Sequence, residues 1–239
     1  MVSLYLVPMT LQEIISPFSA LDGLAILFIL IGWVGSTYLI ENPPEKHPSV
    51  SKLMARYRRE WMSQMVTRNP RIFDSHTLSS LRQGTSFFAS ASMIAIGGGL
   101  ALIGNPEPLV DVASDLSLQL APAIVWDIKI LFIIVFLTNA FLKFVWSHRL
   151  FGYCYILMAA VPNDPEDPNA LPLAQKAAEI NIYAGRSYNR ALRSVYFSLA
   201  ASSWIFGAVP LMIAGLITLA VMYRREFASQ SRRVLLQQD

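Results

Sequence analysis

Long apolar stretches alternate with polar, basic connections along this chain. Four of the stretches are long enough to cross the hydrocarbon core of a bilayer, which takes about 20 helical residues. They lie near residues 20–40, 84–103, 124–146 and 196–223. The pattern predicts an all-α fold, a polytopic membrane helix bundle of about four transmembrane helices, formed by residues 1–239 as a single integral membrane domain.

Proline marks where several of these helices should end or bend. The first stretch runs into Pro43-Pro44 and the second into Pro106. Proline ends a helix because it lacks an N–H donor and clashes with the preceding turn. Pro210, inside the fourth stretch, predicts a kink. Residues 1–23 contain no Lys or Arg, so the first stretch lacks the basic start of a signal peptide and should be retained.

The distribution of Lys and Arg predicts the orientation, because basic residues are retained on the cytoplasmic side. Residues 41–83 hold eight and residues 143–195 hold six, whereas residues 104–123 hold none. We therefore expect a bacterial inner-membrane protein whose long connections, residues 41–83 and 147–195, are cytoplasmic, with both termini outside. The basic residues that follow the fourth stretch would then lie on the less favoured side. In an alternative topology, residues 150–161 form a fifth crossing that brings the C-terminus inside.

The first connection is predicted to contain an amphipathic helix. Leu53, Tyr57, Trp61 and Met65 recur every four residues, with basic residues off that line. One interpretation places this helix on the inner membrane surface, with Arg56 and Arg58 at lipid headgroups. The other packs its apolar line against the second connection.

The second connection is predicted to contain a helix over residues 172–195 that is opened by Pro172. Arg186, Arg190 and Arg193 lie on one face of it, close to the fourth apolar stretch. Anionic headgroups attract such basic clusters at about 1 kcal/mol per charge. We expect these arginines to contact lipid headgroups.

Two patterns in the apolar stretches indicate how the helices are used. Asn139, Lys143 and Ser147 share one face of the third stretch. They form either a polar strip that lines a pathway or a hydrogen-bonded contact between helices with Lys143 extended to the interface. Small residues on the second stretch, Ala91, Ala95 and Gly99, predict a packing face that another helix can approach closely.

Composition narrows the chemistry further. Hydrophobic residues make up 54% of the chain and charged residues 15%, with a mean hydropathy of +0.44 and a net charge of +3. The basic residues are clustered in the connections, so they concern membrane orientation more than nucleic acid, and we expect no nucleic-acid partner. Cys154 is the single cysteine, which excludes an intrachain disulfide and a zinc cluster of usual spacing. We expect no metal and no cofactor.

Several segments resemble the membrane family catalogued as domain of unknown function 599. The similar segments are residues 58–62 (RREWM), residues 77–83 (TLSSLRQ) leading into TSFFASASMIAIGG, LKFVWSHRLFGYCYILMAAVP, NRALR and MYRREFAS, over roughly residues 20–230. The resemblance implies a membrane fold and supplies no activity. It draws attention to Lys143 and to a cytoplasmic-face cluster comprising Arg59, Trp61, Arg82, Trp146, His148, Arg149, Asn189 and Arg193.

No nucleophile motif or paired carboxylates indicate catalysis, so we expect no catalytic residue. The favoured hypothesis is a non-catalytic inner-membrane protein that acts through assembly with itself, as a homo-oligomer, or with another membrane complex, in contact with membrane lipids. A second hypothesis is a small transporter or channel subunit that uses the polar strip. A third is a lipid-headgroup enzyme that uses His148 with Arg149.

Overall fold

The computed structural model describes residues 16–103, 105 and 122–237, and within them the chain is helical with no strand. The helices, in chain order, are α2 (Ala20–Glu41), α3 (Val50–Met65), α4 (Ile72–Leu102), α6 (Ala123–Ala160), α7 (Ala170–Ser202), the short 3₁₀ helix η1 (Ser203–Phe206), α8 (Ala208–Phe227) and α9 (Gln230–Leu236).

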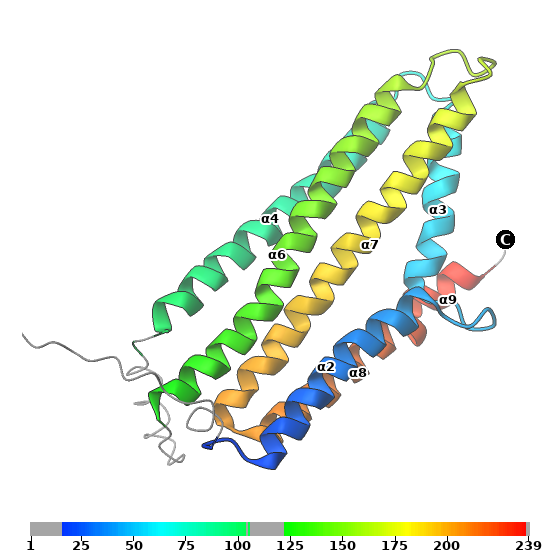
Figure 1. Cartoon of the computed structure of the whole chain (residues 1–239). Helices are drawn as coiled ribbons and strands as arrows, with labels where there is room; N and C mark the ends of the chain where they lie inside the picture. Colours follow the sequence, from blue (N-terminus) through cyan, green and yellow to red (C-terminus); the bar gives the residue numbers. More distant parts are fainter. Residues whose placement is uncertain (1–15, 104, 106–121, 238–239) are drawn as a thin grey trace, which may run out of the picture.

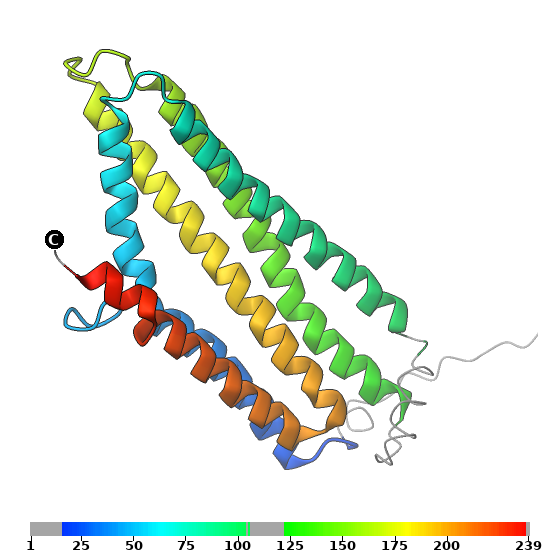
Figure 2. The same cartoon turned by 180° about the vertical axis from the view of Figure 1, so that it is seen from behind.

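Three long helices, α4, α6 and α7, lie side by side in alternating directions and run past the ends of the shorter pair α2 and α8 (Figures 1 and 2). We call the part beyond that pair the arm (residues 50–83 and 147–187). The rest forms the membrane bundle (α2, α8 and residues 84–102, 123–146 and 188–202). Because α6 and α7 continue from one part into the other, the arm is joined to the bundle by unbroken helices.

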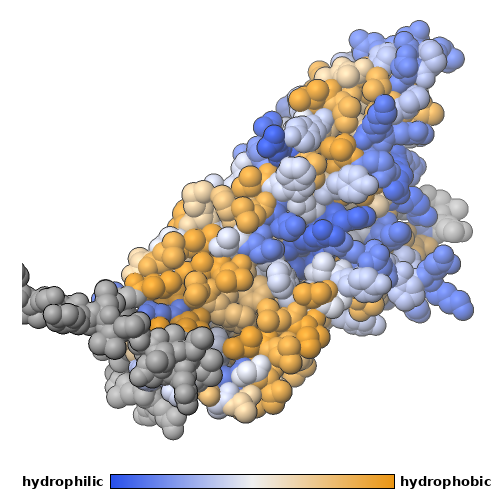
Figure 3. Space-filling model, in the orientation of Figure 1, coloured by the Kyte–Doolittle hydropathy of each residue, from blue (hydrophilic) through white to orange (hydrophobic). Residues whose placement is uncertain are grey.

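Four stretches are long and apolar enough to cross a membrane, namely Ala20–Glu41, Ile72–Leu102, Ala123–Ala160 and Ala208–Leu236. On the face seen in Figure 3, apolar side chains dominate the bundle and polar side chains cover much of the arm. Less than a third of the most apolar window of each stretch is buried inside the protein. Such apolar surface suits a hydrocarbon solvent, so the prediction of a membrane helix bundle is confirmed.

Local sequence accounts for the starts of two of these helices. Ser19 and Asp22 form a reciprocal capping box at the start of α2, and the hydroxyl of Ser49 accepts from the backbone N–H of Lys52 to cap α3. The end of α2 at Glu41, just before Asn42-Pro43, agrees with the predicted boundary. The loop that follows is fixed by Ser49, whose hydroxyl donates to the carbonyl of Ile40 at 2.7 Å.

The segment predicted as one kinked crossing, residues 196–223, is instead a helical hairpin. The α7 helix ends at Ser202, η1 makes the turn, and α8 starts after Gly207, whose φ of 115° is a conformation that glycine adopts freely. Pro210 lies in the first turn of α8, where no helical N–H is lost, so it produces no kink in the middle of a helix. Hydropathy alone merged the two helices because both are apolar near the turn.

This hairpin changes the position of the C-terminal segment. The last turns of α7 run through the bundle against α2 and α8, and α8 returns toward the arm (Figure 1). Consequently Arg232 reaches the loop between α2 and α3, where its Nε donates to the carbonyl of Pro48 at 2.9 Å. Residues 150–160 form no separate helix. They are the arm end of α6, which extends past the predicted end of the third stretch and has Val161 as its C-cap.

The arm and the bundle each have a hydrophobic core. In the arm, Met62 and Met65 of α3 pack with Leu78, Cys154 and the alanines of α7. Thus α3 packs against α7, as in the second interpretation of its apolar line. In the bundle, Phe136 and Phe197 lie among residues of α2 and α8. The two cores hold the connection between them in place, and polar side chains gather there.

Candidate functional site

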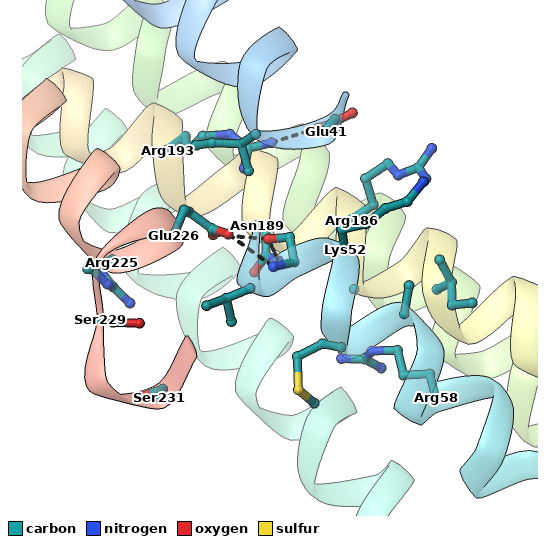
Figure 4. A pocket seen from close by; sticks show the side chains of 17 residues that line it. Glu41, Lys52, Arg58, Arg186, Asn189, Arg193, Arg225, Glu226, Ser229 and Ser231 are labelled. Atoms are coloured by element: carbon teal, nitrogen blue, oxygen red, sulfur yellow. Dashed lines mark hydrogen bonds and ion pairs between the residues drawn. The ribbon is translucent and has the colours of Figure 1, made fainter. Parts of the chain in front are cut away.

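A polar pocket of about 400 Å³ opens where the arm meets the membrane bundle. Its walls are the end of α2, the first half of α3, the middle of α7, the end of α8 and the start of α9 (Figure 4). Its charged lining residues are Glu41, Lys52, Arg58, Arg186, Arg193, Arg225 and Glu226. Five of these seven side chains are cationic, and we call the site the cationic pocket.

The acidic side chains of the pocket are already engaged. Arg190 donates to both carboxylate oxygens of Glu41, and Arg193 donates to one of them at 2.6 Å. Glu226 accepts from the backbone N–H of Ser51 at 3.0 Å and from its hydroxyl at 2.9 Å, so it sits at the start of α3, where the helix dipole favours an anion. Both carboxylates therefore fix the walls.

Four cations of the lining have no carboxylate partner among the described residues: Lys52, Arg58, Arg186 and Arg225. Arg186 lies over the ring of Tyr183 at 5.7 Å, and the guanidinium of Arg225 donates to the hydroxyl of Tyr196. These contacts place the side chains and supply no carboxylate partner within ion-pair distance. The pocket is therefore electropositive.

Arg58 is the most constrained of these four. Its guanidinium is partly buried, donates to the side-chain carbonyl of Asn181, and lies against Gly185, where an added Cβ would come within 3.0 Å of Nη2. Burial lowers the pKa of Arg58, because removing water disfavours the charged form. The fold thus holds a cation with no counter-ion beside the pocket.

Arg193 gives the pocket a second buried cation. Its side chain is 5% exposed, and its Nε has no hydrogen-bond partner. Nearby, Asn189 donates to the hydroxyl of Ser51 at 3.3 Å, which links α7 to the network around Glu226. Figure 4 shows Asn189 beside Glu226 and Arg193 paired with Glu41.

Comparison with known proteins adds a family and no activity. The family described as "Protein of unknown function, DUF599" matches residues 24–231. The chain belongs to this family. No curated protein and no solved structure matches it. The function of this DUF599 member must therefore be argued from its own residues.

The predicted polar strip lies in the contact between α6 and α7. The side-chain oxygen of Asn139 accepts from Ser194 at 3.1 Å, and Ser147, which is fully buried, donates to the carbonyl of Ala184 at 2.8 Å. The side chain of Lys143 lies beyond this contact, in a second pocket of about 370 Å³ that it shares with Trp146. The strip thus joins two helices, as in the contact interpretation.

The predicted cytoplasmic-face cluster is spread over the arm and the adjoining end of the bundle and does not form one site. Arg59 pairs with Glu179, Trp61 donates to Asp74, Arg82 donates to His148, and Arg149 donates to Tyr153; Asn189 and Arg193 alone line the cationic pocket, and Trp146 lines the second one. Each of the first four contacts joins neighbouring turns or helices. We interpret them as contacts that hold the arm together.

His148 contacts several neighbours on α4. Its Nε2 accepts from Arg82 at 3.2 Å, and its Nδ1 lies 3.1 Å from the hydroxyl of Ser86 and 3.3 Å from that of Thr85. Arg149 turns to Tyr153 on its own helix, so the pair predicted for a headgroup enzyme does not converge.

The residues predicted at lipid headgroups have different surroundings. Arg56 is exposed on α3 and lies over the ring of Tyr57 at 5.2 Å, outside the cationic pocket. Arg58 and Arg186 line that pocket, and Arg190 is bound to Glu41. The described residues contain no group of three His, Cys, Asp or Glu side chains that could hold a metal ion.

The predicted small-residue face of α4 contacts α6 at one residue only. Gly99 packs on α6, where an added Cβ would come within 3.0 Å of Ile134. Ala91 and Ala95 are exposed. The contact with α6 also uses Ser92, which is buried in it. The exposed residues therefore have no partner helix within the described chain.

Sequence reasoning missed the acidic half of the pocket. The sequence analysis assigns no role to Glu41 or Glu226, although both line the pocket. The signal was a carboxylate at the membrane boundary of each helix, since such a position calls for a cationic partner. The partners are far away in sequence: Glu226 meets Ser51 across 175 residues.

Proposed function

We propose that this DUF599 member is a non-catalytic bacterial inner-membrane protein that acts by assembling with itself or with another membrane complex through the outer face of α4. The observation that carries the proposal is that α4 has few neighbouring helices within the described chain. Among the described helices, α4 packs extensively only against α6. In its most apolar window, 11% of the residues are buried, which is less than in any other candidate span.

The exposed side of α4 suits a second helix better than lipid alone. Ala91, Ala95 and Gly98 are exposed and follow one another at intervals of four and three residues, which places them on one face. A Cβ added at Gly98 would meet nothing within 4 Å. Small residues in such a row let two backbones approach closely, and in a membrane this contact drives helix association.

The same proposal includes an orientation in which the arm is cytoplasmic. The hairpin at Gly207 returns Arg224, Arg225, Arg232 and Arg233 to the side of the arm. Lys129 is then the single Lys or Arg of the described residues at the far end of the bundle. This distribution satisfies the positive-inside rule, which the single crossing predicted for residues 196–223 violated.

Assembly is tested by bulky substitutions on α4. Blue-native electrophoresis and in-membrane cross-linking should show the wild-type chain in a species larger than the monomer. Gly98→Leu should shift it to the monomer, because the added side chain separates the backbones. Gly97→Leu is the matched control, since Gly97 also has open space but lies about 100° around the helix. A monomeric wild type without a partner, or equal behaviour of the two variants, would refute the proposal.

Orientation is tested by single cysteines in a Cys154→Ala background, labelled with a membrane-impermeant maleimide. Ser231→Cys and Glu45→Cys should both react from the cytoplasmic side, because α9 and the loop after α2 lie on one side of the bundle. Ser203→Cys, at the turn of the hairpin, is the control expected to react from the other side. Labelling of Ser231→Cys from outside would contradict this orientation.

Transport and headgroup hydrolysis are less well supported. The polar strip fills the α6–α7 contact, with Ser147 and Asn139 hydrogen-bonded across it. His148 and Arg149 face different partners. Transport needs a polar pathway and headgroup hydrolysis needs converging catalytic groups, and these residues form neither. Assembly needs an exposed helix face, which α4 has.

A further inference from the structure

We propose that the cationic pocket is a binding site for a phosphate-bearing anion. This inference is independent of assembly through α4, which lies on the far side of α6 from the pocket. The first argument is charge. Each carboxylate oxygen in the lining already accepts from Arg190, Arg193 or Ser51, while four cations around the pocket have no carboxylate partner. An incoming anion therefore meets free donors.

The second argument is that part of this charge is built into the fold. Arg193 is almost completely buried and has an Nε without a partner, and Arg58 is held in place between Asn181 and Gly185. A buried cation that lacks full pairing costs free energy, so its presence needs a compensating partner. Arginine suits phosphate in particular, because its planar donors match two phosphate oxygens at once.

The third argument is position and size. The pocket lies where α2 and α8 end and the polar arm begins, which is the level of lipid headgroups (Figures 3 and 4). Its volume of about 400 Å³ falls within the range of small-ligand sites, about 300–1,000 Å³. Phosphate chemistry at this level has two sources: the headgroup of an anionic phospholipid, or a soluble phosphate ester from the side of the arm.

The test measures binding to the full-length chain in detergent by native mass spectrometry. One arm titrates dioleoyl phosphatidylglycerol against dioleoyl phosphatidylcholine, and the other titrates sn-glycerol 3-phosphate. The test variant is the double substitution Lys52→Gln/Arg186→Gln, at two exposed lining cations. The control is Arg56→Gln/Arg233→Gln, which removes the same charge from exposed positions outside the lining.

The wild-type chain should bind the anionic lipid or the phosphate ester in preference to phosphatidylcholine. Each lining charge removed should weaken this binding about fivefold, and the double variant about 25-fold, while the control stays within about twofold of the wild type. Preference for phosphatidylglycerol assigns the site to a headgroup, and preference for glycerol phosphate assigns it to a soluble ester. Equal binding of the two lipids with no ester bound, or equal losses in the test and control variants, would overturn the proposal.

Discussion

Replacement of Asp74 by alanine tests how the arm is held together. Asp74 is completely buried in the first turn of α4. One of its oxygens accepts from the indole N–H of Trp61 at 2.7 Å and from Arg68, which joins α3, the following loop and α4. Asp74→Ala removes this shared acceptor and leaves the partly buried indole donor of Trp61 without its partner.

The expected loss in the free energy of unfolding follows from these contacts. A hydrogen bond to a charged group is worth about 1.5–3 kcal/mol, and a carboxylate in the first turn of a helix adds about 0.3–1 kcal/mol. The second oxygen of Asp74 has no partner, so its burial offsets part of the gain. We expect a loss of about 3 kcal/mol in the free energy of unfolding, as a balance of these magnitudes.

The exposed ion pair on the same arm serves as the comparison. Arg59 and Glu179 join α3 to α7 at 2.6 Å, with side chains 56% and 44% exposed. Solvent screens such a pair, so Glu179→Ala should cost less than about 1 kcal/mol. The raised pKa of Arg59, which comes first from its hydrogen bond to Glu179, does not alter this expectation because the guanidinium is charged at any working pH.

Cys154 provides the assay, because it is completely buried in the same arm core. A thiol-reactive fluorophore will report unfolding as the temperature rises. For a chain of this length about 1 kcal/mol shifts the midpoint by about 2–4 °C, so Asp74→Ala should lower it by about 6–12 °C and Glu179→Ala by less than about 4 °C. Equal shifts in the two variants would refute the reasoning that burial of the acceptor decides the cost.

Three further predictions use the same thermal assay or its equivalent by circular dichroism. Gly215→Ala should lower the midpoint by a few degrees, because the added Cβ would come within 2.6 Å of a side-chain carbon of Ile29. Gly35→Ala is the control and should not lower the midpoint, because its Cβ would meet no atom within 4 Å. A lower midpoint for Gly35→Ala would contradict the packing argument. Ser147→Ala should cost about 1 kcal/mol by removing the buried bond to α7, and an unchanged midpoint would count against that bond. Glu41→Gln should cost about 3 kcal/mol, because Arg193 is left buried without its counter-ion, and a neutral outcome would be evidence against this pairing.

Hydropathy predicted the fold class and the location of the first three membrane helices. At residues 196–223 hydropathy merged the end of α7 with α8, because both helices are apolar near the turn. An apolar window cannot detect a turn that depends on the φ angle of Gly207. The terminal arginines, placed on an unfavourable side by the merged crossing, were the sequence signal of this error.

The cationic pocket could not be predicted from the sequence. The family resemblance points to Asn189 and Arg193, but the residues around them in the pocket come from α2, α3 and α8. Periodicity predicts which residues share a face of one helix, and it contains no information on which helices meet. Glu41 and Arg190 are 149 residues apart, so their contact follows from the tertiary packing alone.

The unbroken course of α6 and α7 has a mechanical consequence. At 1.5 Å per residue their 38 and 33 residues are about 57 Å and 50 Å long, so each reaches from the tip of the arm to the far end of the bundle. No hinge residue interrupts either helix. A displacement of the tip of the arm would therefore be carried along α7 to the hairpin at Gly207, at the other end of the same helix.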